Sequence, residues 1–322
     1  MYLDETFPDK LETEYVAGVD ENNVEQVLED IIKSGADIVF CVGPQMMPNS
    51  LKVAVEHPEV YILNCSLNAP HPYIRTYYGR MYEAKFLAGM IAGAVTDNER
   101  VAYIADYPIY GMIANINAFA LGVASVNPRA KVYLAWSKTK DYDRNKFLTE
   151  NDLHYVSDQD IITPNDASRY FGLYKLQDGQ ALNLAMPIWN WGVFYEKLLQ
   201  SVLAGSYKAE GQEQVKALNY WWGMSAGVID LICSKHVPYG VKRLADHLKS
   251  DITKGEVVPF FGQIYDQKGE LKNKGEHEMK PSDIMKMDWL VDNVVGSIPP
   301  MSEFVDNAKM VVELKGVEEN KL

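Results

Sequence analysis

The residues of this sequence that are best suited to chemistry are two acids in the tetrapeptide "SDQD", Asp158 and Asp160. In an extended chain, residues two apart point the same way, which would bring their carboxylates together as in a pair that hydrolyses a glycosidic bond. No arrangement of serine, histidine and acid accompanies them. Polar contacts to a ligand, or plain solvation of a loop, explain the same spacing with fewer requirements. The sequence therefore favours binding over catalysis here, and hydrolysis stays as a lesser alternative.

Large side chains gather near the ends of apolar, strand-like runs. Trp189 and Trp191 come directly before an amphipathic helix, and Trp222, Tyr110 and Met46 follow other such runs. An indole offers a flat apolar area at low entropic cost, which suits stacking on a heterocycle or on the face of a sugar. A tryptophan that packs in the core is just as common. Both interpretations stay open for each of these rings.

The composition excludes several classes of protein. Lys plus Arg total 31 against 44 Asp plus Glu, a formal net charge of −13, and the basic residues are scattered. Nucleic acid is therefore not an expected partner, because duplex binding needs clustered cations. No glycine-rich phosphate motif is present, and the six histidines show no metal-ligand spacing with each other or with the three cysteines. We expect no cofactor and no metal.

Two further patterns concern membranes and packing. The longest apolar run, residues 86–95, is far shorter than the roughly 20 residues that cross a bilayer. The first residues contain no recognisable signal peptide. Within the apolar run, Gly89 and Gly93 are spaced for a close backbone contact, which we expect between this helix and a sheet.

Strand-like and helix-like segments alternate along the chain. Apolar runs at residues 38–42, 60–65 and 101–105 predict buried strands, and an i, i+3, i+4, i+7 spacing predicts a one-faced helix at 24–32. This rhythm indicates a parallel, doubly wound sheet, whose ligands collect at the carboxyl ends of the strands. Five such ends are polar or aromatic, more than one open sheet shares comfortably. The predicted fold class is α/β, with two doubly wound parallel-sheet lobes around a cleft.

Three blocks of sequence, in the same order, are similar to the basic membrane protein family. They are "YYGRMYEAKFLAGMIAGAV" with its continuation, "AMPIWNWGVFYEKLLQSVLAGSY", and "YWWGMSAGVIDL" running on to "GEVVPFFGQIYDQKGEL". Members of this family are substrate-binding lipoproteins of ABC importers, several of which bind purine nucleosides. The resemblance implies a type I periplasmic binding protein fold without catalysis, a small, neutral, flat ligand such as a nucleoside, and an ABC permease as a partner.

The sequence departs from the family in three places. The family's acidic D-x-D reads Tyr174 and Leu176 here, and the lysine of many nucleoside binders is replaced near Trp189. We predict that the first β-α unit of the fold is missing, which would leave an open slot between a strand at residues 11–16 and the strand at 38–42. The second lobe looks reduced, because "SKTKDYDRNKFLTEND" stands where the family has a full helix.

These considerations define the expected lobes and site. Lobe 1 is predicted at residues 1–106 plus about 188–235, a reduced lobe 2 at 107–187, and a return helix, hairpin and tail of uncertain lobe at 236–322. The expected ligand-binding residues are Met46, Asn64, Asp106, Tyr110, Asp158, Gln159, Trp189, Trp191 and Trp222.

The alternative, from another class of protein, is an intracellular small-molecule sensor or regulatory domain with the same fold, forming the C-terminal part of a longer protein. The family suggests an extracytoplasmic, membrane-anchored location. The lack of a visible signal peptide or lipobox leaves a cytoplasmic location open.

Overall fold

The computed structural model describes residues 2–67, 73–160, 169–205 and 219–317. It separates the chain into two compact units. Unit 1 contains residues Met1–Gly79 and Asn190–Trp222, and unit 2 contains Arg80–Trp189 and Gly223–Leu322. The chain therefore passes between the units three times, after Gly79, Trp189 and Trp222.

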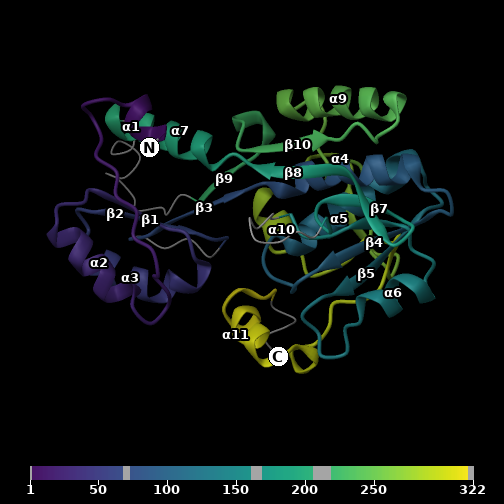
Figure 1. Ribbon diagram of the computed structural model, residues 1–322, viewed down its shortest axis with the longest axis horizontal. Helices are drawn as coiled ribbons and strands as arrows, with labels where there is room; N and C mark the ends of the chain where they lie inside the picture. The colour runs from purple at the N-terminus through teal and green to yellow at the C-terminus, as the bar shows by residue number, and fades with distance from the viewer. Residues whose placement is uncertain (1, 68–72, 161–168, 206–218, 318–322) are drawn as a thin grey trace. The chain divides into compact units, whose positions relative to one another are not determined.

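Unit 1 is built on a four-stranded sheet in the order β1-β2-β3-β9, with every neighbouring pair parallel. Figure 1 shows α2 and α3 on one side of this sheet and α1 with α7 on the other. The elements of unit 1 are α1 (Tyr2–Thr6), α2 (Val24–Lys33), β1 (Ile38–Cys41), η1 (Pro44–Met46), α3 (Met47–Glu56), β2 (Tyr61–Cys65), β3 (Arg75–Gly79), α7 (Trp191–Leu203) and β9 (Asn219–Trp222).

The spacing of apolar residues explains how α2 packs in unit 1. Its residues Val24 and Leu28 are buried in one core with Val53 of α3 and Ile62 of β2, as the predicted one-faced helix requires. Residues 11–16, in contrast, form no strand. Tyr15 and Val16 are exposed, so this segment has no apolar face to bury against a sheet. The predicted slot between two strands is therefore wrong.

Unit 2 is built on a seven-stranded mixed sheet in the order β10-β8-β7-β6-β4-β5-β13. β13, β5, β4 and β6 run parallel, and then β7, β8 and β10 alternate in direction. Its strands are β4 (Arg100–Ala105), β5 (Lys131–Trp136), β6 (Tyr155–Ser157), β7 (Leu173–Gln177), β8 (Gln180–Trp189), β10 (Ile229–Cys233) and β13 (Val294–Val295), and β11 (Gln263–Tyr265) and β12 (Leu271–Lys274) form a separate hairpin.

The helices of unit 2 cover both faces of this sheet. Tyr103 of β4 packs on Phe119 of α5, whereas its neighbours Ala102 and Ile104 pack with Leu148 of α6. α6 has only seven residues, in the segment whose sequence lacks apolar periodicity. The helices are α4 (Met81–Val95), α5 (Met112–Val126), α6 (Arg144–Glu150), η2 (Met224–Ala226), α9 (Tyr239–Lys254), α10 (Pro281–Met285), η3 (Met301–Glu303) and α11 (Asp306–Lys315).

The glycines of α4 make a helix–helix contact rather than the predicted helix–sheet contact. A Cβ atom on Gly89 would lie 2.0 Å from the carbonyl oxygen of Phe119, and one on Gly122 of α5 would lie 2.0 Å from that of Phe86. Only glycine allows the two backbones to come this close. α4 and α5 therefore form one tightly joined pair.

The division of the chain also differs from the predicted lobes. The first boundary lies at Gly79 rather than near residue 106, because β4 hydrogen-bonds to β5 and β6 and so belongs to the sheet of unit 2. Residues 236–322, whose lobe the sequence left open, belong to unit 2 as well. α/β architecture with parallel strands in each of two lobes is confirmed.

Candidate functional site

The carboxyl ends of several strands of unit 2 meet at one edge of its sheet. β5, β4 and β6 are parallel, and β8 has the same direction because two antiparallel pairings separate it from β6. In sheets of this kind ligands bind outside the carboxyl ends of the strands. We call the polar side chains at this edge the strand-end cluster, which consists of Lys85, Asp106, Ser137, Arg144, Asp158, Asp160 and Tyr174.

Asp158 is the best-connected member of the cluster. Its Oδ2 lies 2.8 Å from Nη2 of Arg144 and accepts a hydrogen bond of 3.0 Å from the Tyr174 hydroxyl, while Oδ1 accepts the Gln159 N–H at 2.9 Å. Burial raises the pKa of the Tyr174 hydroxyl well above its ordinary range, so it stays a proton donor. The Arg144 guanidinium also lies 4.1 Å from the centre of the Tyr170 ring. The negative charge of Asp158 is thus neutralised inside the protein.

Asp160 is paired with a different cation. Its Oδ1 lies 2.6 Å from Nζ of Lys85, a residue in the second turn of α4 that is only 1% exposed. The same ammonium group donates to Oγ of Ser157 at 3.1 Å and lies 5.0 Å from the centre of the Tyr103 ring. Burial raises the pKa of Asp160, and the attraction of Lys85 opposes this rise.

The two acids of "SDQD" therefore do not form a carboxylate pair. Asp158 turns toward Tyr174, which packs in the core on the α6 face of the sheet. Asp160 turns toward Lys85 beside Tyr103, on the face covered by α4 and α5. The prediction that both point the same way is wrong, because β6 ends at Ser157 and the extended geometry does not continue.

Asp106 follows β4 and is half-buried at the same edge. Its Oδ1 accepts a short hydrogen bond from the Ser137 hydroxyl, which follows β5. Its Oδ2 has no hydrogen-bond partner within the described part of the chain. The next residue, Tyr107, packs on a small core around Phe304, and Tyr110 is half-buried two residues before α5.

Gln159 is exposed at this edge beside Asp158. Its main chain is held by a hydrogen bond from Gly172 N–H to its carbonyl oxygen, at 2.6 Å. Its side-chain amide makes no hydrogen bond within residues 2–67, 73–160, 169–205 and 219–317, and so offers a donor and an acceptor to solvent or to a ligand.

Two predicted site residues of unit 1 are used by the fold itself. Met46 is buried in the core between α2, α3 and the sheet. Asn64 is 0% exposed, donates to the Gly43 carbonyl oxygen at 3.0 Å and accepts from the Ser66 hydroxyl at 2.7 Å. These contacts account for both residues without a ligand.

The tryptophans lie where the chain changes units. Trp189 ends β8, opposite Ile229, and is half-buried. Trp191 begins α7 and makes edge contacts with Tyr77 and Phe194, 5.6 Å and 6.0 Å between ring centres. We call the group of rings in unit 1 the aromatic cluster, which consists of Phe40, Tyr77, Trp191, Phe194, Tyr195, Tyr220 and Trp222. Trp191 and Trp222 therefore pack in unit 1 while each keeps part of its side chain exposed.

Sequence reasoning missed Lys85 and Arg144. The signal for Lys85 was present, since α4 reads "MYEAKFLAGMIAGAV" and a lysine in a mostly apolar helix must find a partner when it is buried. Arg144 lies in a segment without periodicity, and its partner Asp158 could not be found without the fold.

The chain is similar to known substrate-binding proteins. Residues 2–170 match the family described as Bmp, ABC transporter substrate-binding protein PnrA-like. A purine-binding protein of Brucella abortus is 26% identical over 311 residues, which cover 92% of this chain and 87% of that protein. A candidate ABC transporter glucose-binding protein of Haloferax volcanii is 30% identical over 239 residues, or 70% of this chain and 59% of that protein.

Solved structures share the fold at low sequence identity. An ABC transporter solute-binding protein from Conexibacter woesei matches with a TM-score of 0.55 and 17% identity, covering 80% of this chain and 90% of that one. A transcriptional activator of the comK gene from Bacillus halodurans matches with a TM-score of 0.58 and 13% identity, covering 75% and 87%. Of the helices that the structure describes, none has the length and apolar character needed to cross a bilayer.

Proposed function

We propose that this chain, which belongs to the Bmp family of PnrA-like ABC transporter substrate-binding proteins, binds a small, neutral, flat ligand such as a purine nucleoside for ABC-type uptake. The family is one of binding proteins, not of enzymes. The name of the Brucella abortus relative, a purine-binding protein, supports a purine as the first ligand to test. The candidate glucose-binding relative makes glucose the natural comparison.

The pairing of charges in the strand-end cluster is the observation that supports a neutral ligand. Arg144 is held by Asp158, and Lys85 by Asp160, so each of these cations already has a carboxylate. An anionic ligand would have to compete with a bound carboxylate for either cation. A neutral ligand needs only hydrogen-bond donors and acceptors.

Two groups at this edge remain to supply those hydrogen bonds. The Gln159 amide is exposed and can both donate and accept, and Oδ2 of Asp106 can accept from a sugar hydroxyl or a base N–H. We propose both as ligand contacts. Asp158 then acts through Arg144 and Tyr174, by fixing the chain from which Gln159 projects.

Titration calorimetry with adenosine, guanosine, inosine and glucose tests this proposal. We expect at least one nucleoside to bind, and glucose to bind more weakly. Gln159→Ala removes a neutral hydrogen-bonding group worth about 0.5–1.5 kcal/mol, so the Kd should rise about 2- to 12-fold. Gln180→Ala is the matched control, because Gln180 is exposed at the start of β8, at the opposite edge of the same sheet. If glucose binds more tightly than every nucleoside, a nucleoside is not the ligand. If Gln159→Ala and Gln180→Ala have equal Kd values, this edge of the sheet is not the binding site.

A further inference from the structure

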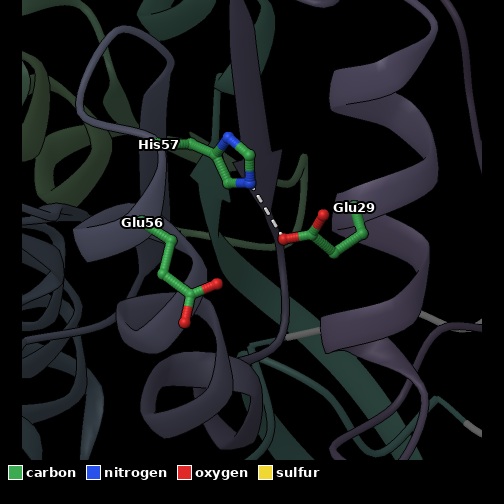
Figure 2. Close-up of side chains that lie close together, drawn as sticks. All are labelled: Glu29, Glu56 and His57. Atoms are coloured by element: carbon green, nitrogen blue, oxygen red, sulfur yellow. Dashed lines mark hydrogen bonds and ion pairs between the residues drawn. The ribbon is translucent and has the colours of Figure 1, made fainter.

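Unit 1 contains a histidine surrounded by carboxylates, away from the strand ends. His57 caps the C-terminal end of α3, Glu56 is the last residue of that helix, and Glu29 projects from α2. Figure 2 shows the Glu29 carboxylate facing the His57 ring, with the Glu56 carboxylate below the ring. One ligand atom from each residue lies within 4.8 Å of the others.

The hydrogen bonds of the ring set its orientation. Nδ1 of His57 lies 3.3 Å from Oε1 of Glu59, and Nε2 lies 2.9 Å from Oε1 of Glu29. When Nδ1 carries the proton and donates it to Glu59, Nε2 presents a lone pair to a carboxylate oxygen. Two acceptors at this distance repel each other unless a proton or a cation lies between them.

We propose that Glu29, Glu56 and His57 bind a divalent transition-metal ion of the zinc class. One imidazole nitrogen and two carboxylate oxygens form a donor set that suits zinc, and water would complete a four-coordinate shell. The Glu59 carboxylate on Nδ1 is the outer partner that commonly orients a metal-binding histidine.

The geometry requires only small side-chain movements. Zinc bonds of about 2.0–2.1 Å hold neighbouring ligand atoms about 3.3 Å apart in a tetrahedron, so the 2.9 Å contact would open slightly. Glu56 is exposed and makes no hydrogen bond or ion pair within the described residues, so its carboxylate is free to turn inward. Lys33 lies 3.7 Å from Oε2 of Glu29, which is not the oxygen that faces His57. The ion would join α2 to α3.

Glu56→Gln is the sharpest variant for a test, because the Glu56 side chain is exposed and makes no hydrogen bond or ion pair among the residues that the structure describes. The chelator-treated protein is titrated with ZnCl2 by calorimetry, and the visible spectrum is recorded with CoCl2. We expect one Zn²⁺ per chain, a Kd raised at least tenfold in Glu56→Gln, and loss of binding in His57→Gln. The Co²⁺ complex should show the intense visible bands of a four-coordinate ion.

His154→Gln provides the matched control. His154 also lies between two carboxylates, 3.9 Å from Asp97 and 3.3 Å from Asp152, on opposite nitrogens of its ring. This variant should bind Zn²⁺ as the unchanged protein does. In chelator, Glu56→Gln and the unchanged protein should have equal melting temperatures. Added Zn²⁺ should raise the melting temperature of the unchanged protein only. The proposal would be overturned by a Kd for Zn²⁺ above about 100 µM, or by equal Kd values for Glu56→Gln and the unchanged protein. Either result would mean that a second proton on His57, and not a metal ion, lies between Nε2 and the Glu29 carboxylate.

Discussion

The ammonium group of Lys85 lies 2.6 Å from the Asp160 carboxylate, in an ion pair whose two members differ in exposure. The Lys85 side chain is 1% exposed and that of Asp160 is 19% exposed. Water can therefore solvate the acid in part but cannot reach the lysine. Removal of one partner should therefore lower the free energy of unfolding by an amount that depends on which charge remains in the protein.

Asp160→Asn leaves the Lys85 ammonium buried without its counter-charge. Removing one partner of a buried ion pair typically lowers the free energy of unfolding by about 3–5 kcal/mol. We expect a decrease of about 3 kcal/mol here, because Ser157 still accepts a hydrogen bond from Lys85. Lys85→Met should cost less, since the remaining carboxylate is partly solvated. Urea unfolding of the two single variants and the double variant measures both values. A larger loss in Lys85→Met than in Asp160→Asn would contradict the asymmetry.

The local elements of this fold could be predicted because each has a clear apolar pattern. The period of α2 and the continuous apolar runs of β1, β2 and β4 are visible in the sequence and appear in the structure. The boundary between units could not be predicted in the same way, since it depends on which strands pair with β4. The sequence shows that β4 is a strand, but it does not show which strands pair with it.

The sequence showed which polar residues follow strands, but it did not show which side chains would lie beside them. Asp106, Asp158 and Gln159 do lie at one edge of the unit 2 sheet. The cations that neutralise the acids come from α4 and α6, and no spacing rule connects Lys85 to Asp160 or Arg144 to Asp158 across 75 and 14 positions. The internal partners of Asn64 were not predictable either, because an amide at a strand end can hydrogen-bond to a loop as readily as to a ligand.

Glycine substitutions in two helices should change stability in opposite directions, because Gly89 lies in the close contact between α4 and α5 and Gly240 faces open space in α9. Gly89→Ala places a methyl group 2.0 Å from the Phe119 carbonyl oxygen, so the helices must move apart at a cost of about 1–3 kcal/mol. Gly240→Ala, in the first turn of α9, meets open space and should raise the free energy of unfolding by about 0.4–1 kcal/mol. Thermal unfolding measures both, and a Gly89→Ala protein as stable as the unchanged one would show that the pair is less tightly joined.

Glu83 predicts a pH dependence of stability. Its buried carboxylate accepts the Met224 N–H at 2.6 Å and lies 3.3 Å from Nε of Arg80. Burial raises the pKa of Glu83 above its ordinary 4.5, and the attraction of Arg80 and the hydrogen bond from Met224 oppose this rise. Between 4.5 and the raised pKa the native state binds more protons than the unfolded chain, so the free energy of unfolding falls as pH rises through this window.

Glu83→Gln removes the titrating proton and keeps an oxygen for Met224. The fall in stability above pH 4.5 should therefore be smaller in this variant than in the unchanged protein. Urea unfolding at half-unit steps from pH 4.5 to 7 gives both curves. Identical slopes would show that Glu83 keeps an ordinary pKa in the folded protein.

Two tryptophans predict losses of ligand affinity. Stacking of a base on an aromatic ring is worth about 1–3 kcal/mol, so Trp191→Ala or Trp189→Ala should weaken nucleoside binding about tenfold or more if the ring contacts the ligand. Trp289→Ala is a suitable control, because this half-buried ring precedes β13, at the other edge of the sheet. Calorimetry measures the Kd of each variant. If neither variant changes the Kd more than the control does, both tryptophans serve only to pack the fold.

Asp106 gives the most direct test of the strand-end site, because its two oxygens have separate duties. Oδ1 accepts from Ser137, whereas Oδ2 is available to a ligand. Asp106→Asn is nearly isosteric and leaves no cavity. A hydrogen bond to a charged group is worth about 1.5–3 kcal/mol, so the Kd for a nucleoside should rise about 10- to 150-fold. Ser137→Ala removes only the internal bond, and should change affinity far less than Asp106→Asn does. If Asp106→Asn keeps its affinity and the pH dependence of that affinity, the carboxylate serves the loop before Pro108, and Gln159 becomes the better polar contact on this unit.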